Sequence, residues 1–262
     1  MTGISPPRRL PATTLATLLA AALVAWIVSV ARMRGMDAGP GTDLGSLGWY
    51  LGIWVTMTAA MMLPSAAPMV WLFATLSRGI RTWIFVGGYV AAWTAYGLVA
   101  YGLFRVVTSL GTAWLEWDRA GPYAAAGAIA AAGIYQLTPL KALCLRRCRH
   151  PLHFVMRSRR GGPLGALRMG LVHGLYCVGC CSGLMVILFA LGLMSVVWMG
   201  LVAALVFAEK VLPYGYRLAR PIALALLALA IWLASAPASV PGLTQPGTGM
   251  DPGSSRPGQM KP

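Results

Sequence analysis

The sequence predicts an all-α fold, a polytopic transmembrane bundle of about seven helices. Of the 262 residues, 58% are hydrophobic and only 10% are charged. The apolar residues fall in long blocks instead of the alternating or one-faced patterns of soluble domains. Because backbone groups in lipid must be hydrogen-bonded within their own segment, helices are the expected spanning elements.

A helix that crosses the bilayer needs roughly 20 mostly apolar residues. On this basis we expect helices at 14–31, 49–75, 84–107, 121–139, 168–192, 196–213 and 218–235. The first has a longer apolar run than a signal peptide and no small-residue cleavage site after it, so we expect it to be retained. The transmembrane domain is then 1–235, and the Pro-, Gly- and Ser-rich segment 236–262 predicts a disordered tail.

The basic residues predict the orientation of the chain. A net charge of +15 is also typical of nucleic-acid binders, so the distribution of the 21 Lys and Arg decides. Two lie at 8–9, two at 78–81, eight at 141–168 and three at 210–220, all in connections on one side of the bundle. The positive-inside rule therefore predicts a cytosolic N-terminus and an external C-terminus. The basic residues are thus explained by orientation in a membrane. The lipid bilayer is the expected partner, and nothing supports binding of nucleic acid.

Soft metal ligands are concentrated in "HGLYCVGCC", inside the fifth apolar block. On a helix, with His173 at zero, Cys177 lies at about +40°, Cys180 at about −20° and Cys181 at about +80°. Thiolate and imidazole are ligands that Cu(I) and Zn(II) prefer. We therefore expect His173, Cys177 and Cys180 to share one face of a metal site, with Cys181 pointing away from His173.

A packing interpretation of the same stretch stays open. Gly170, Gly174, Gly179 and Gly183 have the spacing of close helix contacts, and cysteine is common in such interfaces. An ionisable histidine inside a bilayer is costly and usually functional, which favours the metal site.

The second apolar block carries "MTAAMMLPSAAPM". Pro64 and Pro68 each remove a backbone hydrogen bond and should kink or unwind the helix. Met61 and Met62 lie about 20 Å from its cytosolic end, and Cys180 lies about 18 Å from the cytosolic end of its own helix. Because thioethers suit Cu(I), we expect Met61 or Met62 to complete the site, although methionine is also a common apolar filler.

A second ligand cluster lies in the expected cytosolic loop 140–167. Its "CLRRCRHPLH" contains Cys144, Cys148, His150 and His153. We expect Cys144 and Cys148 to be reduced, cytosol-accessible thiols that capture metal. The alternative is a basic surface that contacts anionic lipid headgroups.

The pair Glu209 and Lys210, in "FAEKVLP", lies near the end of the sixth block. Lysine can anchor a helix at the interface, and Glu209 is a candidate proton carrier or oxygen ligand. The sequence has no nucleotide-binding loop, nucleophile elbow or H-E-x-x-H motif, so we expect neither an enzyme nor an ATP-driven pump.

These motifs, together with "YQLTPLKALCLRRCRHPL" and "GALRMGLVHGLYCVGCC", resemble a bacterial family of predicted metal-binding integral membrane proteins, some labelled copper chaperones. The resemblance covers roughly 49–213. It implies a multi-helix inner-membrane protein with a metal role. The motif positions are Met61, Met62, Pro64, Gln136, Pro139, Lys141, Cys144, Cys148, His173, Cys177, Cys180 and Cys181.

Residues and resemblance together predict binding or trafficking of a soft metal, with Cu(I) first and zinc second. Copper donor or acceptor proteins are the expected partners. Two other hypotheses stay open. The first is a membrane thiol oxidoreductase whose cysteines cycle against a quinone, and the second is an assembly subunit whose cysteines only pack.

Overall fold

The computed structural model describes residues 10–33, 45–77, 79–109, 121–158, 162–191 and 195–236. Every regular element in these ranges is a helix, which confirms the predicted fold class. The expected disordered tail, apart from Ala236, lies outside the described residues, as do Arg8, Arg9 and Arg78.

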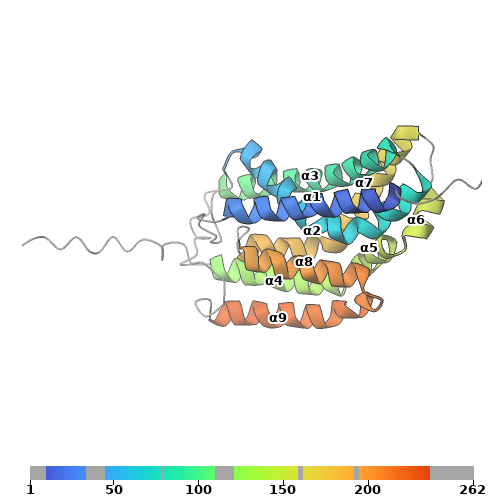
Figure 1. The fold of residues 1–262 in the computed structure, drawn as a ribbon. Helices are drawn as coiled ribbons and strands as arrows, with labels where there is room; N and C mark the ends of the chain where they lie inside the picture. The colour runs from blue at the N-terminus through green and yellow to red at the C-terminus, as the bar shows by residue number, and fades with distance from the viewer. Residues whose placement is uncertain are drawn as a thin grey trace, which may run out of the picture.

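Seven of the described helices run back and forth along the bundle and correspond to the seven expected spans (Figure 1). They are α1 (Leu10–Met33), α2 (Leu47–Leu76), α3 (Ile80–Ser109), α4 (Gly121–Gln136), α7 (Gly162–Leu191), α8 (Val196–Val211) and α9 (Ala219–Ser235). The short helices α5 (Pro139–Arg149) and α6 (Pro151–Ser158) lie together at one end of the bundle. A 3-10 turn, η2 (Gly215–Leu218), precedes α9.

Five described segments are long and apolar enough to cross a membrane, namely α1, α2, α3, α7 and the η2–α9 segment. The pair α4 and α5 passes the same test together, but the two helices are bent by 63°. The bend follows from Pro139, which lacks an N–H and disfavours helical backbone at Thr138. The Thr138 hydroxyl then caps α5 by accepting from the backbone N–H of Lys141 at 3.3 Å. Helix α8 has 16 residues, so it spans about 24 Å, short of the roughly 30 Å hydrocarbon core.

The 140–167 segment, expected as a polar loop, is helical over most of its described length. It contains nearly all of α5, then α6, and then the first six residues of α7, which begins at Gly162. Proline stands at the first position of both α5 and α6, where its fixed φ suits a helix start. Arginines in the last turn of α5 complement the helix dipole.

Helix α2 is continuous through Pro64 and Pro68. The expected unwinding at these prolines is therefore absent from α2. Each proline still leaves one carbonyl of the preceding turn without its helical donor.

Glycines set the contacts of α7 on two of its faces. Gly170 and Gly174 touch α3, where a β-carbon at Gly174 would lie 2.6 Å from that of Ala92. Gly179 and Gly183 touch α5 and α4 on another face. Helix α7 is thus held closely between α3 and the α4–α5 pair, as the glycine spacing indicated.

Two adjacent glycines of α3 give a test of this packing. A β-carbon at Gly88 would collide with the carbonyl oxygen of Leu167, whereas one at Gly87 would meet no described atom within 4 Å. We expect Gly88→Ala to lower the free energy of unfolding by about 1–3 kcal/mol through overpacking. Gly87→Ala should leave it unchanged or raise it by up to about 1 kcal/mol through helix propensity. Thermal unfolding in detergent measures both, and equal effects would contradict the close α3–α7 contact.

The described basic side chains, except Arg32 and Arg105, gather where α5 and α6 lie, which we call the basic end. Figure 1 shows that the starts of α1, α3 and α7 and the end of α8 also lie there. The basic residues at this end are Arg81, Lys141, Arg146, Arg147, Arg149, Arg168, Lys210, Arg217 and Arg220. That the basic end faces the cytosol remains a prediction from the charge distribution.

Candidate metal centre

Three thiols of α7 form a cluster in the interior of the bundle. The sulfur atoms of Cys177, Cys180 and Cys181 all lie within 4.8 Å of one another, and the three side chains are buried. The Sγ atoms of Cys180 and Cys181 are 3.4 Å apart. We call these three residues the thiol triad. In the part of the chain that the structure describes, it is the one such group of three or more His, Cys, Asp or Glu ligands.

Helical spacing and side-chain rotamers together produce the triad. Cys180 and Cys181 lie three and four residues after Cys177, so both are neighbours of Cys177 on the helix surface. Cys180 and Cys181 leave the backbone about 100° apart, but rotation about χ1 brings their sulfurs together. Cys181, a candidate ligand that the face predicted around His173 left out, therefore belongs to the cluster.

His173 lies one turn before the triad and is 3% exposed. Its ring packs against those of Phe85, Tyr89 and Phe154, with centroid distances of 6.0, 5.7 and 5.6 Å. Among the described side chains it does not belong to the mutually close group. Its Nδ1 is buried and has no hydrogen-bond partner among the described residues. An unpartnered nitrogen in this interior is costly, so His173 is an available donor for a ligand.

Lys210 of α8 reaches into the bundle and contacts the triad. Its Nζ donates to Cys177 Sγ at 2.8 Å and to Ser65 Oγ at 3.2 Å. The hydroxyl of Tyr89 lies 2.9 Å from the same sulfur. The ammonium is therefore placed to offset negative charge on a thiolate at Cys177. The sequence reasoning considered Lys210 as an interfacial anchor and did not identify this contact.

Glu209, which precedes Lys210 in the chain, forms an ion pair with Lys141. Glu209 is the single acidic residue in the described ranges, and both of its oxygens accept from Lys141 Nζ, at 2.6 and 2.8 Å. Both side chains of this ion pair are 2% exposed. Glu209 is thus held as the partner of Lys141 and not presented to the triad.

Arg149 makes a second connection between α5 and α8. Its guanidinium donates to the carbonyl of Glu209 and, at 2.6 and 2.8 Å, to those of Leu212 and Pro213. These carbonyls lie at the end of α8, where helix carbonyls lack intrahelical donors. The ion pair and Arg149 together fix α5 against α8.

The ligands expected in the 140–167 segment have different surroundings, as far as the structure describes them. Cys148 Sγ lies 3.8 Å from Cys180 Sγ. Cys144 is 8% exposed, with its sulfur against Gly179. The expectation of an accessible thiol is therefore wrong for Cys144. His150 is exposed, and the side chain of His153 lies outside the described residues.

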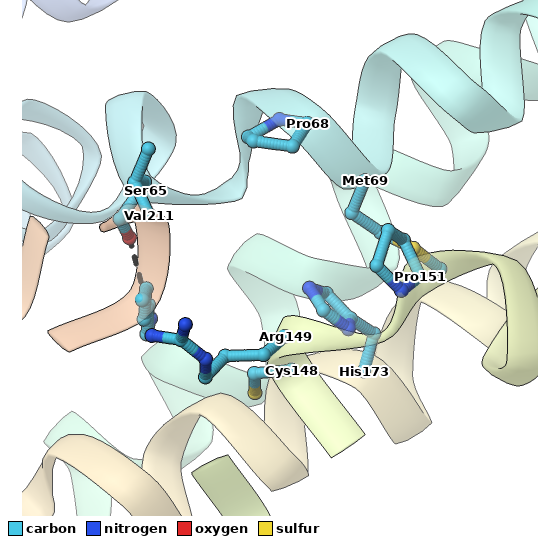
Figure 2. A pocket seen from close by; sticks show the side chains of 9 residues that line it. Ser65, Pro68, Met69, Cys148, Arg149, Pro151, His173 and Val211 are labelled. Atoms are coloured by element: carbon cyan, nitrogen blue, oxygen red, sulfur yellow. Dashed lines mark hydrogen bonds between the residues drawn. The ribbon is translucent and has the colours of Figure 1, made fainter. Parts of the chain in front are cut away.

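A cavity of about 140 Å³ lies beside the triad. Figure 2 shows His173 and Cys148 on one side of it, with Ser65 and Pro68 of α2 on the opposite side. Its lining residues are Ser65, Pro68, Met69, Cys148, Arg149, Pro151, His173, Lys210 and Val211. The methionine of α2 that lines the cavity is thus Met69.

Met61 and Met62 are 2% and 0% exposed and belong to the apolar core. They precede Ser65, the contact of Lys210, by about one turn, so they lie on a neighbouring part of the same face of α2. A ligand role for either thioether remains a prediction.

The sulfur separations in the triad are compatible with a metal ion bound by all three thiols. Three sulfurs about 2.3 Å from a central ion would be about 4 Å apart. The separations in the triad, from 3.4 Å between Cys180 and Cys181 to at most 4.8 Å, bracket that value. Thiolates select Cu(I) and Zn(II), and structural zinc sites take four protein ligands. The triad alone supplies three.

A comparison with protein-family models matches residues 51–233 to the PpoB2 family, described as copper chaperone. The match covers more than two thirds of the chain, from α2 almost to the end of α9, and contains the triad, Lys210 and the cavity. It confirms the resemblance seen in the sequence motifs. No curated protein and no solved structure matches the chain.

Proposed function

The chain belongs to the PpoB2 copper chaperone family, and from that premise we propose that it binds Cu(I) at the thiol triad and hands the ion to another protein. The observation that carries the proposal is the cluster of three buried sulfurs within 4.8 Å of one another. Thiolates are the preferred ligands of Cu(I). Three of them meeting inside a helical bundle exceed what helix packing requires.

Lys210 also supports the binding of Cu(I) at the triad. A Cu(I) ion bound by two or three thiolates carries net negative charge, which is costly in an apolar interior. The ammonium of Lys210, 2.8 Å from Cys177 Sγ, offsets part of that charge. The ligands of the proposed site are therefore Cys177, Cys180 and Cys181, with Lys210 and Tyr89 holding the first of these sulfurs.

In this proposal the protein lies in the bacterial inner membrane with its basic end toward the cytosol, as the distribution of Lys and Arg predicts. Cu(I) is exchanged there with a copper donor or acceptor protein. Zinc is the second metal that the donor set accepts, provided that Cys148 or His173 supplies a fourth ligand.

Metal analysis of the purified protein tests the proposal. We expect about one Cu(I) per chain to remain after anaerobic loading with a reductant and extensive washing, because three thiolates hold the ion. Cys144→Ser should keep the same stoichiometry, since Cys144 packs against Gly179 outside the triad. Protein that retains no copper, or retains zinc in preference, would contradict the proposal.

One observation favours the thiol oxidoreductase as the second candidate. Cys148 Sγ and Cys180 Sγ, on different helices, are only 3.8 Å apart. In that reaction the two thiols would give two electrons and two protons to a quinone and form a disulfide. Metal-free protein in which Cys148 and Cys180 become linked in a membrane-quinone assay would support this candidate over the copper chaperone.

A further inference from the structure

We propose that Cys148, His173 and Met69 form a separate loading site for Cu(I) in the cavity, from which the ion passes to the triad through Cys148. This inference rests on the proposed function and adds to it a second site and an order of binding. The ligand is Cu(I) delivered on thiolate ligands.

The cavity gathers soft donors from three different elements. Met69 comes from α2, Cys148 from α5 and His173 from α7, and all three line the same space of about 140 Å³. Thioether, thiolate and imidazole together suit Cu(I). None of the three belongs to the triad, so the donor set is additional to the one already described.

His173 gives an independent indication of a ligand. It is 97% buried, lines the cavity, and its Nδ1 has no hydrogen-bond partner among the described residues. A histidine that served only to fill the core would leave this nitrogen unsatisfied at a cost of about 1–3 kcal/mol. In this proposal a metal ion bound to the imidazole gives the buried ring a function that packing alone does not.

Cys148 connects the cavity with the triad. It lines the cavity, and its sulfur is 3.8 Å from that of Cys180. The ion can therefore move by exchanging one ligand at a time. A bond between copper and Cys180 forms as the bond to Cys148 breaks, and the proton released by the Cys180 thiol passes to the sulfur of Cys148. Copper remains Cu(I), so no electron is transferred.

The charges around the cavity indicate the form in which copper arrives. Arg149 and Lys210 both line it, and the single described carboxylate, that of Glu209, is bound to Lys141. A bare cation would be repelled, whereas Cu(I) carried by two thiolates is an anion and would be attracted. The cavity has room for several water-sized groups only. The ion and one or two ligating groups of a donor can therefore occupy it.

Loading kinetics and affinity of Cys148→Ser test the loading site, with a Cu(I)–glutathione complex as the donor. We expect the variant to keep its tightly bound Cu(I), because the triad is intact. Loading should slow by about tenfold or more, which corresponds to about 1.4 kcal/mol on the barrier. The wild type should also bind a second, weaker equivalent of Cu(I) that Cys148→Ser lacks. Cys144→Ser, which changes the neighbouring cysteine of α5, should match the wild type in both measurements.

Two further variants separate the donors from their packing roles. His173→Phe keeps a ring among Phe85, Tyr89 and Phe154, and Met69→Leu keeps the apolar volume. We expect each to lose the weaker equivalent and to slow loading while the tight site persists. Unchanged stoichiometry and loading in all three variants would overturn the loading site.

The outcomes also distinguish this inference from the proposed function. Loss of the tight site in Cys148→Ser would make Cys148 a fourth ligand of the triad and would overturn the separate site. Wild-type protein that binds no Cu(I) at all would overturn the proposed function itself. A Cys180→Ser variant that loses the tightly bound Cu(I) but keeps the weaker equivalent would support both the proposed function and the separate loading site.

Discussion

Cys181→Ser should weaken Cu(I) binding by at least about 100-fold, as much as Cys177→Ser or Cys180→Ser, because the three sulfurs belong to one cluster. Serine preserves side-chain size but offers a hard oxygen in place of a soft thiolate. The loss should exceed the roughly 10–100-fold typical of groups that only support a ligand. Anaerobic competition against a coloured Cu(I) chelator measures the three affinities.

Cys144→Ser is the matched control for these variants. It removes another buried thiol of the same bundle, 8% exposed, that lies outside the triad. Its Cu(I) affinity should equal that of the wild type. If Cys181→Ser behaved like this control while the other two variants lost binding, Cys181 would be a packing residue, as its backbone direction alone suggested.

Glu209→Gln should lower the free energy of unfolding of the metal-free protein by about 3–5 kcal/mol, because it leaves the buried ammonium of Lys141 without its counter-charge. The double variant Lys141→Met with Glu209→Gln should recover most of this loss, since no isolated charge remains. Denaturant unfolding in detergent, followed by circular dichroism, compares the three proteins.

The loss of unfolding free energy in Glu209→Gln shows whether the ion pair of Lys141 and Glu209 is buried in the detergent-solubilised protein. A loss below about 1 kcal/mol is typical of exposed ion pairs and would contradict the arrangement of α5 against α8. The double variant also excludes a general intolerance of position 209, because it retains the same glutamine.

The helices were predictable because the signal for them is local. A block of about 20 apolar residues identifies a span without reference to any other part of the chain. The fourth span was expected to end at 139, whereas α4 ends at Gln136. Thr138 followed by Pro139 carries the signal for the break between α4 and α5. The helical character of 140–167 was missed because its polar composition was taken to indicate a loop.

The site was predictable only as far as a single helix determines it. Helical spacing placed Cys177 and Cys180 on one face with His173. It left Cys181 off that face, because backbone angles neglect the rotation of its side chain. The contacts of Lys210 and Cys148 could not be derived, since they depend on which helices are neighbours. A lysine beside a lone glutamate in an apolar block is the one signal that marked Lys210 as unusual.

X-ray absorption spectroscopy of the protein loaded with one equivalent of Cu(I) tests the central claim most directly. We expect a copper ion surrounded by three sulfurs at about 2.3 Å, the usual length of a metal–thiolate bond, with no nitrogen or oxygen neighbour. The Cys144→Ser variant should give the same spectrum. Copper bound through imidazole nitrogen, or through oxygen, in the wild type would contradict a site built on Cys177, Cys180 and Cys181.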